Sequence, residues 1–362
     1  MKKKLEPSIK ISIDKKIISQ NNPVYFIAEI GSNFDNDLNR AKDLIYLAKN
    51  SGADAVKFQH YTAKSLVSDY GFKSLGSRKS HQEKWKKSVY KTYKDASLNK
   101  EWTYELQETC NKAEISFLTS PYSLELVDYV DQYVPAFKVG SGDITWIEII
   151  KKMASKGKPI ILATGASSME DVNRALDAIL NITSDVILLQ CNTNYTAKNN
   201  NFMHLQLRVI QEFQKLYPGI ITGLSDHMPG HVSVLGSVAL GAKVIEKHFT
   251  DSVDRSGPDH LFSMTPNSWR EMVSRTRELE LSLGDGVKKV EKNEKDTVIA
   301  QRRSICLVDN HSKGDILTRR DLTVLRPCKE DSIPPYEIEN IIGKTLKINV
   351  SAGEYIKWTD LI

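Results

Sequence analysis

Eight apolar runs of strand length are the feature that most constrains the fold of this chain. The runs are nearly continuous rather than alternating, which is typical of parallel strands buried on both faces of a sheet. They cover residues 24–30, 55–61, 115–120, 136–141, 159–165, 186–192, 220–226 and 243–249.

Helical patterns lie between these runs and complete a repeated strand–helix unit. They cover residues 38–50, 100–113, 124–130, 146–154, 169–180, 204–216, 231–241 and 266–283. Eight such units predict an α/β fold, a (β/α)8 TIM barrel. An open doubly wound sheet is the alternative, but no glycine fingerprint follows the first run, so we favour the barrel.

The pattern changes after Gly284, where a charged segment leads into short strand-like runs. We therefore predict a barrel domain over residues 1–284, a linker over 285–300 and a small, mostly β domain over 301–362. A polar lead-in or hairpin is expected before residue 23. Residues 62–97 are an over-long loop, which indicates either a lid over the barrel's carboxyl end or a solvated basic insertion.

Composition excludes several classes of protein. The net charge of +5 is mild and suits small anionic substrates. A basic run over residues 73–94 contains aromatic residues, but acids and serines dilute it, so nucleic-acid binding is the weakest hypothesis. No apolar run is long enough for a membrane span, and none follows the basic N-terminus as a secretory signal requires. The four cysteines show no metal-binding spacing, which predicts free thiols and a cytoplasmic protein.

Two histidines follow neighbouring strands at equivalent positions. His227 follows the seventh apolar run and His248 lies in the eighth. Parallel strands would bring both imidazoles to one edge of the barrel, where they can hold one divalent metal with positions left open for catalysis. The loop that follows is expected to place Asp254, Asp259 and His260 over the same face.

The other strand ends carry a concentration of polar residues, where barrel enzymes place their chemistry. Lysine in a buried strand is costly unless it is paired, so Lys57 and Lys138 indicate a site, and the hydroxyls beside them suit a phosphate. An inward lysine could instead form a Schiff base, so a class I aldolase stays open. The strand-end residues are Glu29, Lys57, Gln59, Thr119, Ser120, Lys138, Ser141, Asp143, Asn192, Asn194, Tyr195, Ser225 and Glu246.

At these residues the chain resembles the sialic acid synthase family, which comprises the N-acetylneuraminate, legionaminic acid and pseudaminic acid synthases. The tail, with LRP at 325–327, resembles that family's C-terminal antifreeze-like SAF domain. The matching segments are IAEIG (27–31), GADAVKFQ (52–59), LTSPYS (118–123), AFKVGSGD (136–143), ILATGAS (161–167), GLSDH (223–227), ALGAKVIEKHFT (239–250) and SGPDH (256–260).

The resemblance implies a metal-assisted transferase that condenses phosphoenolpyruvate with an N-acylated hexosamine, such as N-acetylmannosamine or a diacetamido-trideoxyhexose, to a nonulosonic acid and phosphate. It implies that His227 and His248 bind Mn²⁺ or Mg²⁺ and that Glu29 acts beside the reacting carbons. It also implies a domain-swapped homodimer in which Arg326 reaches the partner's barrel. Phosphoenolpyruvate is expected at Lys57, Gln59, Thr119, Lys138, Ser141 and Ser225, and the sugar at Asp143, Tyr195, Asp259 and Arg326.

The chain departs from the family pattern around the sugar. Phe34 stands at a usual histidine, Asp143 replaces a usual glutamate, and Ala163 stands where a phosphate-binding serine is frequent. The segment RPCKEDSIPP (326–335) replaces a glycine-containing turn. Because both histidines and both lysines are kept, we interpret these changes as a different acceptor sugar. The alternatives are a barrel aldolase or lyase that uses Lys138, and a non-catalytic sugar-binding relative.

Overall fold

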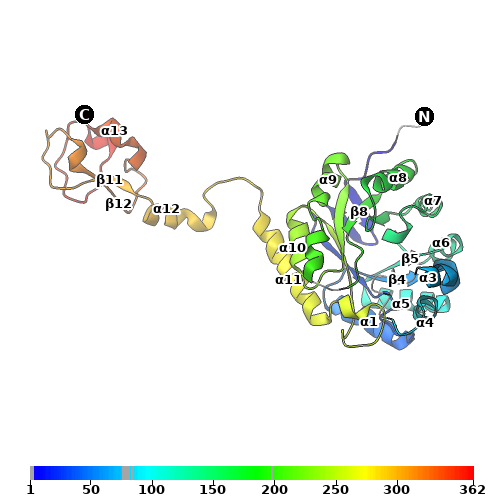
Figure 1. Ribbon diagram of the computed structural model, residues 1–362. Helices are drawn as coiled ribbons and strands as arrows, with labels where there is room; N and C mark the ends of the chain where they lie inside the picture. Colours follow the sequence, from blue (N-terminus) through cyan, green and yellow to red (C-terminus); the bar gives the residue numbers. More distant parts are fainter. Residues whose placement is uncertain (1–3, 76–81, 83–84, 197–198) are drawn as a thin grey trace. The chain divides into compact units, whose positions relative to one another are not determined.

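The computed structural model describes residues 4–75, 82, 85–196 and 199–362, and it divides into two compact units, Met1–Gly284 and Asp285–Ile362. The first unit is a closed barrel of eight parallel strands, in the order β10-β3-β4-β5-β6-β7-β8-β9 (Figure 1). The predicted TIM barrel is therefore confirmed. Its strands are β3 (Tyr25–Glu29), β4 (Ala55–His60), β5 (Ser116–Pro121), β6 (Phe137–Val139), β7 (Ile160–Ala163), β8 (Val186–Cys191), β9 (Ile221–Asp226) and β10 (Val244–His248).

Eight helices follow the strands in turn, each close to its predicted position. The helix predicted over residues 204–216 begins only at Val209, because Gln206 has a φ of 52°, which is outside the helical region. The helices are α1 (Leu38–Asn50), α5 (Thr103–Ala113), α6 (Leu124–Val130), α7 (Ile147–Ala154), α8 (Met169–Leu180), α9 (Val209–Leu216), α10 (Val232–Ala239) and α11 (Pro266–Leu283).

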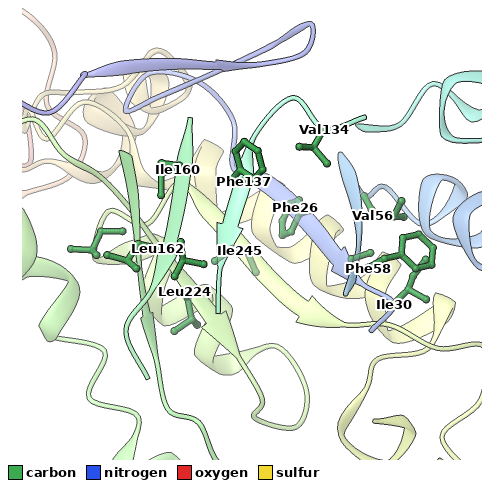
Figure 2. Close-up of a cluster of buried hydrophobic side chains, with 14 of the residues drawn as sticks. Phe26, Ile30, Val56, Phe58, Val134, Phe137, Ile160, Leu162, Leu224 and Ile245 are labelled. Carbon is green, nitrogen blue, oxygen red and sulfur yellow. The ribbon is translucent and has the colours of Figure 1, made fainter. Parts of the chain in front are cut away.

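Two hydrophobic layers hold the barrel together, as period-two alternation along each strand requires. The outer layer packs the strands against the helices, and Figure 2 shows part of it, including Phe26, Phe58 and Phe137. The inner layer fills the barrel with residues such as Ile161 and Leu189. The chemistry is therefore confined to the ends of the strands.

An N-terminal hairpin closes the amino-terminal end of the barrel. Its strands, β1 (Lys10–Ile13) and β2 (Lys16–Ser19), are antiparallel. Ile11, Ile13 and Ile18 are buried in the same cluster as the inner barrel residues. The hairpin thus leaves the carboxyl end as the accessible end.

In the segment predicted as a long loop after β4, the described residues form three short helices. They are α2 (Ala63–Leu66), α3 (Asp69–Ser74) and α4 (Val89–Ala96). Each begins with a hydroxyl cap, from Thr62, Ser68 and Ser88 respectively, which accepts a hydrogen bond from a backbone N–H of the first turn. Described residues of this insertion line the pocket at the carboxyl end of the barrel.

The second unit has a small core of its own around Ile305, Leu317 and Ile356. Strands β11 (Ser304–Leu307) and β12 (Leu322–Leu325) pair antiparallel, and helix α13 (Ile338–Ile341) follows. The segment predicted as a linker contains helix α12 (Lys295–Gln301) and groups with this unit. Among the described residues, no helix is long and apolar enough to cross a membrane. All four cysteines are free, as predicted.

Candidate active site

A pocket of about 410 Å³ opens at the carboxyl end of the barrel, and it gathers most of the predicted site residues. They come from strands or following loops distributed around the whole barrel, so only the closed fold brings them together. The predicted residues that line it are Glu29, Lys57, Gln59, Lys138, Ser141, Asp143, Tyr195, Ser225, His227, His248 and Asp259.

His227 and His248 lie side by side, with ring centroids 5.6 Å apart. Both are buried, and the rings of Tyr195 and Phe262 pack against them. The Nδ1 of His227 is 3.1 Å from the carbonyl oxygen of Asn192. A proton on Nδ1 that is donated to this carbonyl leaves Nε2 with its lone pair, the state a metal ligand needs.

The histidine pair fits a divalent cation in a site with open positions. Burial lowers the pKa of His248 to about 3, so its imidazole is neutral at neutral pH. Its Nδ1 is buried without a hydrogen-bond partner in the described chain, and the nearest carboxylate oxygen, on Asp259, is 4.0 Å away. No group of three or more His, Cys, Asp or Glu in the described chain could hold an ion. Oxygen atoms of substrate or water would therefore complete the coordination.

Two lysines and two glutamates form a buried charge cluster beside the histidines. The Nζ of Lys57 is 2.5 Å from Glu29 Oε2, and the Nζ of Lys138 is 2.9 Å from Glu246 Oε1. Lys57 also approaches Glu246 at 4.0 Å, and Ser225 donates to Glu246 Oε1 at 3.0 Å. Glu246 thus joins both predicted anion-binding lysines.

The two glutamates titrate differently because their surroundings differ. Burial raises the pKa of Glu29 to about 7, although Lys57 opposes this shift. For Glu246, burial acts in the same direction, but Lys138 and Lys57 outweigh it and hold the pKa at about 2. The cluster therefore sets two lysines against one carboxylate whose pKa is low and one carboxyl whose pKa burial raises. Such a cluster attracts an anion.

Two aspartates, Asp259 and Asp143, also line the pocket. Asp259 accepts hydrogen bonds from the backbone N–H and hydroxyl of Ser32, at 3.1 and 2.6 Å. The Asp259 carboxylate can lie this close because residue 31 is glycine. A Cβ at Gly31 would stand 2.7 Å from Asp259 Oδ2, and the φ of 55° at Gly31 also favours glycine.

Burial raises the pKa of Asp143 to about 6, with Lys138 opposing the shift.

Four aromatic residues form a wall, which we define as Tyr61, Trp85, Tyr93 and Tyr122. Trp85 and Tyr93 lie in the insertion after β4, whereas Tyr61 directly follows β4 and Tyr122 directly follows β5. Ring centroids are 5.7 Å apart for Tyr61 and Tyr93, 5.8 Å for Trp85 and Tyr93, and 6.0 Å for Tyr61 and Tyr122. All four residues line the pocket. The pocket therefore has a charged end in the barrel and an aromatic end beneath the insertion.

Thr119 does not face the pocket, which corrects its predicted role. Its hydroxyl donates to the Phe58 carbonyl and is 2.8 Å from the Nδ1 of His60, on the helix side of the sheet. Side chains alternate along a strand, so the neighbouring Ser120 faces inward instead, 3.4 Å from Lys57 Nζ.

Two residues of the loop after β10 are also placed differently from the prediction. Asp254 is exposed and does not line the pocket. His260 is buried and does not line the pocket, because its two ring nitrogens contact Thr250 and Asp35. Of the three residues expected over the histidine pair, only Asp259 lies there.

A pair of neighbouring substitutions tests this orientation. Thr119→Val is expected to lower the free energy of unfolding by about 1–3 kcal/mol, because it leaves a buried His60 nitrogen without its partner. It should leave the KM for the anionic substrate unchanged. Ser120→Ala should raise that KM with little effect on stability. Thermal unfolding and steady-state kinetics of both variants provide the measurement, and the opposite pattern would contradict the placement.

The departures from the family pattern lie mostly outside the pocket. Phe34 is buried in the outer core, where it packs against Phe58 and Trp102. Ala163 is buried in the inner core. Arg326 is exposed and directly follows β12 in the second unit. Asp143 alone lines the pocket.

Sequence reasoning assigned no role to several residues of the pocket. Glu246 stood among the strand-end residues, but its partner Lys138 is 108 positions away and no local pattern reveals the pair. The aromatic residues of the insertion carried no strand-end signal. The pocket residues that sequence reasoning did not single out as site residues are Ser32, Tyr61, Leu66, Val67, Phe72, Gln82, Trp85, Thr92, Tyr93, Ala96, Tyr122, Thr193 and Pro258.

Comparison with known proteins identifies two regions of this chain. The NeuB family matches residues 44–288, and the SAF domain matches residues 302–362. The first match begins within α1 and covers the rest of the barrel, including most of the pocket, and the second covers the small β unit.

Similar proteins span nearly the whole chain. The N,N'-diacetyllegionaminic acid synthase of Legionella pneumophila is 37% identical over 92% of this chain and 93% of its own length. The human N-acetylneuraminate-9-phosphate synthase is 31% identical over 94% of this chain and 93% of its own length. The crystal structure of an N-acetylneuraminic acid synthetase from Leptospira borgpetersenii matches with a TM-score of 0.70 and 28% identity, over 81% of this chain and 96% of that one.

Proposed function

The chain belongs to the NeuB family and carries a SAF domain, and on that premise we propose that it is a phosphoenolpyruvate-dependent nonulosonic acid synthase. In the proposed reaction, a carbon–carbon bond forms between phosphoenolpyruvate and the aldehyde of an N-acylated hexosamine, and phosphate leaves. One observation carries the proposal: a single pocket joins the Lys57–Glu29 and Lys138–Glu246 ion pairs and a histidine pair to a polar, aromatic end.

Phosphoenolpyruvate is proposed to bind at the charged end. Lys57 and Lys138 supply ammonium donors, and Ser225, Ser141 and Ser120 supply hydroxyls around them. Ser141 already accepts a hydrogen bond from the backbone N–H of Gly165 at 2.9 Å, which orients its hydroxyl. Several convergent donors suit a phosphate better than a single charge does.

Glu29 is proposed to manage a proton at the reacting carbons. Its carboxyl is fixed by Gln59, which donates to Oε1 at 2.6 Å, and by Lys57. A pKa raised to about 7 by burial matches the requirement for a general acid or base at neutral pH.

A divalent cation, Mn²⁺ or Mg²⁺, would be held by His227 and His248. When bound, it would supply Lewis-acid polarisation of the sugar aldehyde. Both histidines line the pocket that also contains the lysine–glutamate pairs and the aromatic wall.

The acceptor sugar is proposed to extend from the histidines toward Asp143, Tyr195, Asp259 and the aromatic wall. Carboxylates accept hydrogen bonds from sugar hydroxyls, while aromatic faces suit the apolar faces and acyl methyl groups of a sugar. We further propose that Arg326 of a second copy completes this end in a homodimer.

The pKa of Asp143 gives this assignment a pH dependence. Below about pH 6 the carboxyl is protonated and loses acceptor capacity, so the KM for the sugar should rise as pH falls from 7 to 5. Asp143→Asn should show a high KM with little change over that range. A KM that is independent of pH in the unaltered protein would contradict contact between Asp143 and the sugar.

A class I aldolase that uses Lys138 is the competing function. Schiff-base formation needs a free, neutral amine, whereas Lys138 is held in a buried ion pair with Glu246. We therefore expect no covalent adduct when the protein is treated with borohydride in the presence of pyruvate and sugar. An adduct located at Lys138 by peptide mass spectrometry would favour the aldolase.

Phosphate release tests the proposed function. Release from phosphoenolpyruvate should require both a divalent cation and a sugar, across a panel of N-acylated hexosamines with and without a second acylamino group. EDTA should abolish it. Turnover that survives EDTA would reject the metal role, and sugar binding without phosphate release would favour a non-catalytic relative.

A further inference from the structure

A buried ion pair lies directly behind the two histidines. The Nζ of Lys247 is 2.5 Å from Asp226 Oδ2, and the side chains are 1% and 0% exposed. Asp226 precedes His227 in the chain, Lys247 precedes His248, and the two charged residues are register partners on β9 and β10. Because side chains alternate along a strand, the pair faces the helices while the histidines face the pocket.

The same two side chains hold the backbone on the far side of His227. Asp226 Oδ1 accepts from the N–H of Met228 at 3.0 Å, and Lys247 donates to the carbonyl of Met228 at 2.6 Å. Ser233, in the first turn of α10, donates to Asp226 Oδ2 at 2.5 Å. The turn that carries His227 is therefore tied both to the strand that carries His248 and to the helix behind it.

The ion pair of Asp226 and Lys247 serves geometry rather than stability. A buried ion pair gains little over well-packed apolar residues, because both charges must leave water. Here Asp226 and Lys247 each have more than one partner, and these contacts fix the backbone beside His227 and His248, whose separation matters for a shared ligand. A metal site requires its ligands to be held within about 0.5 Å of the productive arrangement.

We propose that Asp226 and Lys247 are positioning residues that set the spacing and orientation of His227 and His248 for one divalent cation. This inference rests on the proposed metal role of the histidines. Neither residue lines the pocket. Their effect passes through the backbone of Met228 and the register between β9 and β10.

The double substitution Asp226→Asn with Lys247→Met tests the proposal, because it removes both charges and leaves no single buried ion. The dissociation constant for Mn²⁺ is measured on the full chain without substrates, from the electron paramagnetic resonance signal of free Mn²⁺. The double variant should bind Mn²⁺ about 10–100-fold more weakly than the unaltered protein. Ser233→Ala, which removes one partner of Asp226 and keeps the ion pair, should show a smaller loss.

Thr222→Val is the matched control, since Thr222 is a buried hydrogen-bonded residue near the start of β9, bonded to Gln214. It should leave Mn²⁺ affinity unchanged. Thermal unfolding identifies the variants that fold, and equal Mn²⁺ affinity in every folded variant would overturn the positioning role while leaving the proposed function intact. Failure of the unaltered protein to bind Mn²⁺ would overturn the metal role itself, and the positioning role with it.

Discussion

Replacement of His248 by alanine is expected to lower kcat/KM by at least about 10³-fold, which corresponds to about 4 kcal/mol of transition-state stabilisation. The imidazole is buried beside His227, and its removal would leave one histidine to hold the cation. The KM for phosphoenolpyruvate should change much less, because the lysines that bind it remain. Steady-state kinetics at saturating Mn²⁺ provide the measurement.

His60→Asn is the matched control for this variant. His60 is also a buried histidine at the end of a barrel strand, but its ring nitrogens contact Thr119 and Thr103 on the helix side. Its loss should reduce stability and spare kcat/KM per folded molecule. A His248→Ala protein that keeps full activity would show that the histidine pair has no part in the chemistry.

Glu29→Gln is expected to lower kcat by about 10²–10⁴-fold, the range for loss of a general acid or base. Glutamine has nearly the same shape and can still accept a hydrogen bond from Gln59, so the pocket should keep its form. The pKa of Glu29 is raised to about 7 by burial, so the carboxyl is protonated below that pH and ionised above it. The inflection of kcat near pH 7 should disappear in the variant.

Asp54→Asn controls for the loss of a buried carboxylate. Asp54 accepts from the backbone N–H of Phe26 at 2.7 Å and pairs with Lys16, near the amino-terminal end of the barrel. Its substitution should affect stability and leave the pH profile of kcat unchanged. An unaltered profile in Glu29→Gln as well would assign the proton transfer to another group.

The barrel could be predicted from the sequence because parallel strands buried on both faces leave continuous apolar runs. Each run matched a strand to within a few residues, and the polar residues at their ends marked the pocket. Sequence position alone did not fix which face each residue occupies. Thr119 and Ser120 both lie near the end of the same strand, but a shift of one residue reverses the face. The prediction assigned substrate binding to Thr119, which faces the helices, whereas Ser120 faces the barrel interior.

Long-range pairing explains what the sequence did not reveal. The helices of the insertion are four to eight residues long, too short for a periodic pattern, and their packing over the pocket depends on tertiary contacts. Glu246 joins lysines from β4 and β6, which lie far from it in the chain. Neither Asp226 nor Lys247 shows its role without the register between β9 and β10.

The central claim, that this pocket joins phosphoenolpyruvate to a sugar, is tested most directly by following the new bond. Phosphoenolpyruvate labelled with ¹³C at carbon 3 is incubated with Mn²⁺ and an N-acylated hexosamine labelled with ¹³C at carbon 1, and the products are examined by NMR. We predict a one-bond coupling between the two labels in a single product, with phosphate released in equal amount. Labels that remain in separate molecules, with pyruvate and unchanged sugar as the only products, would contradict the account.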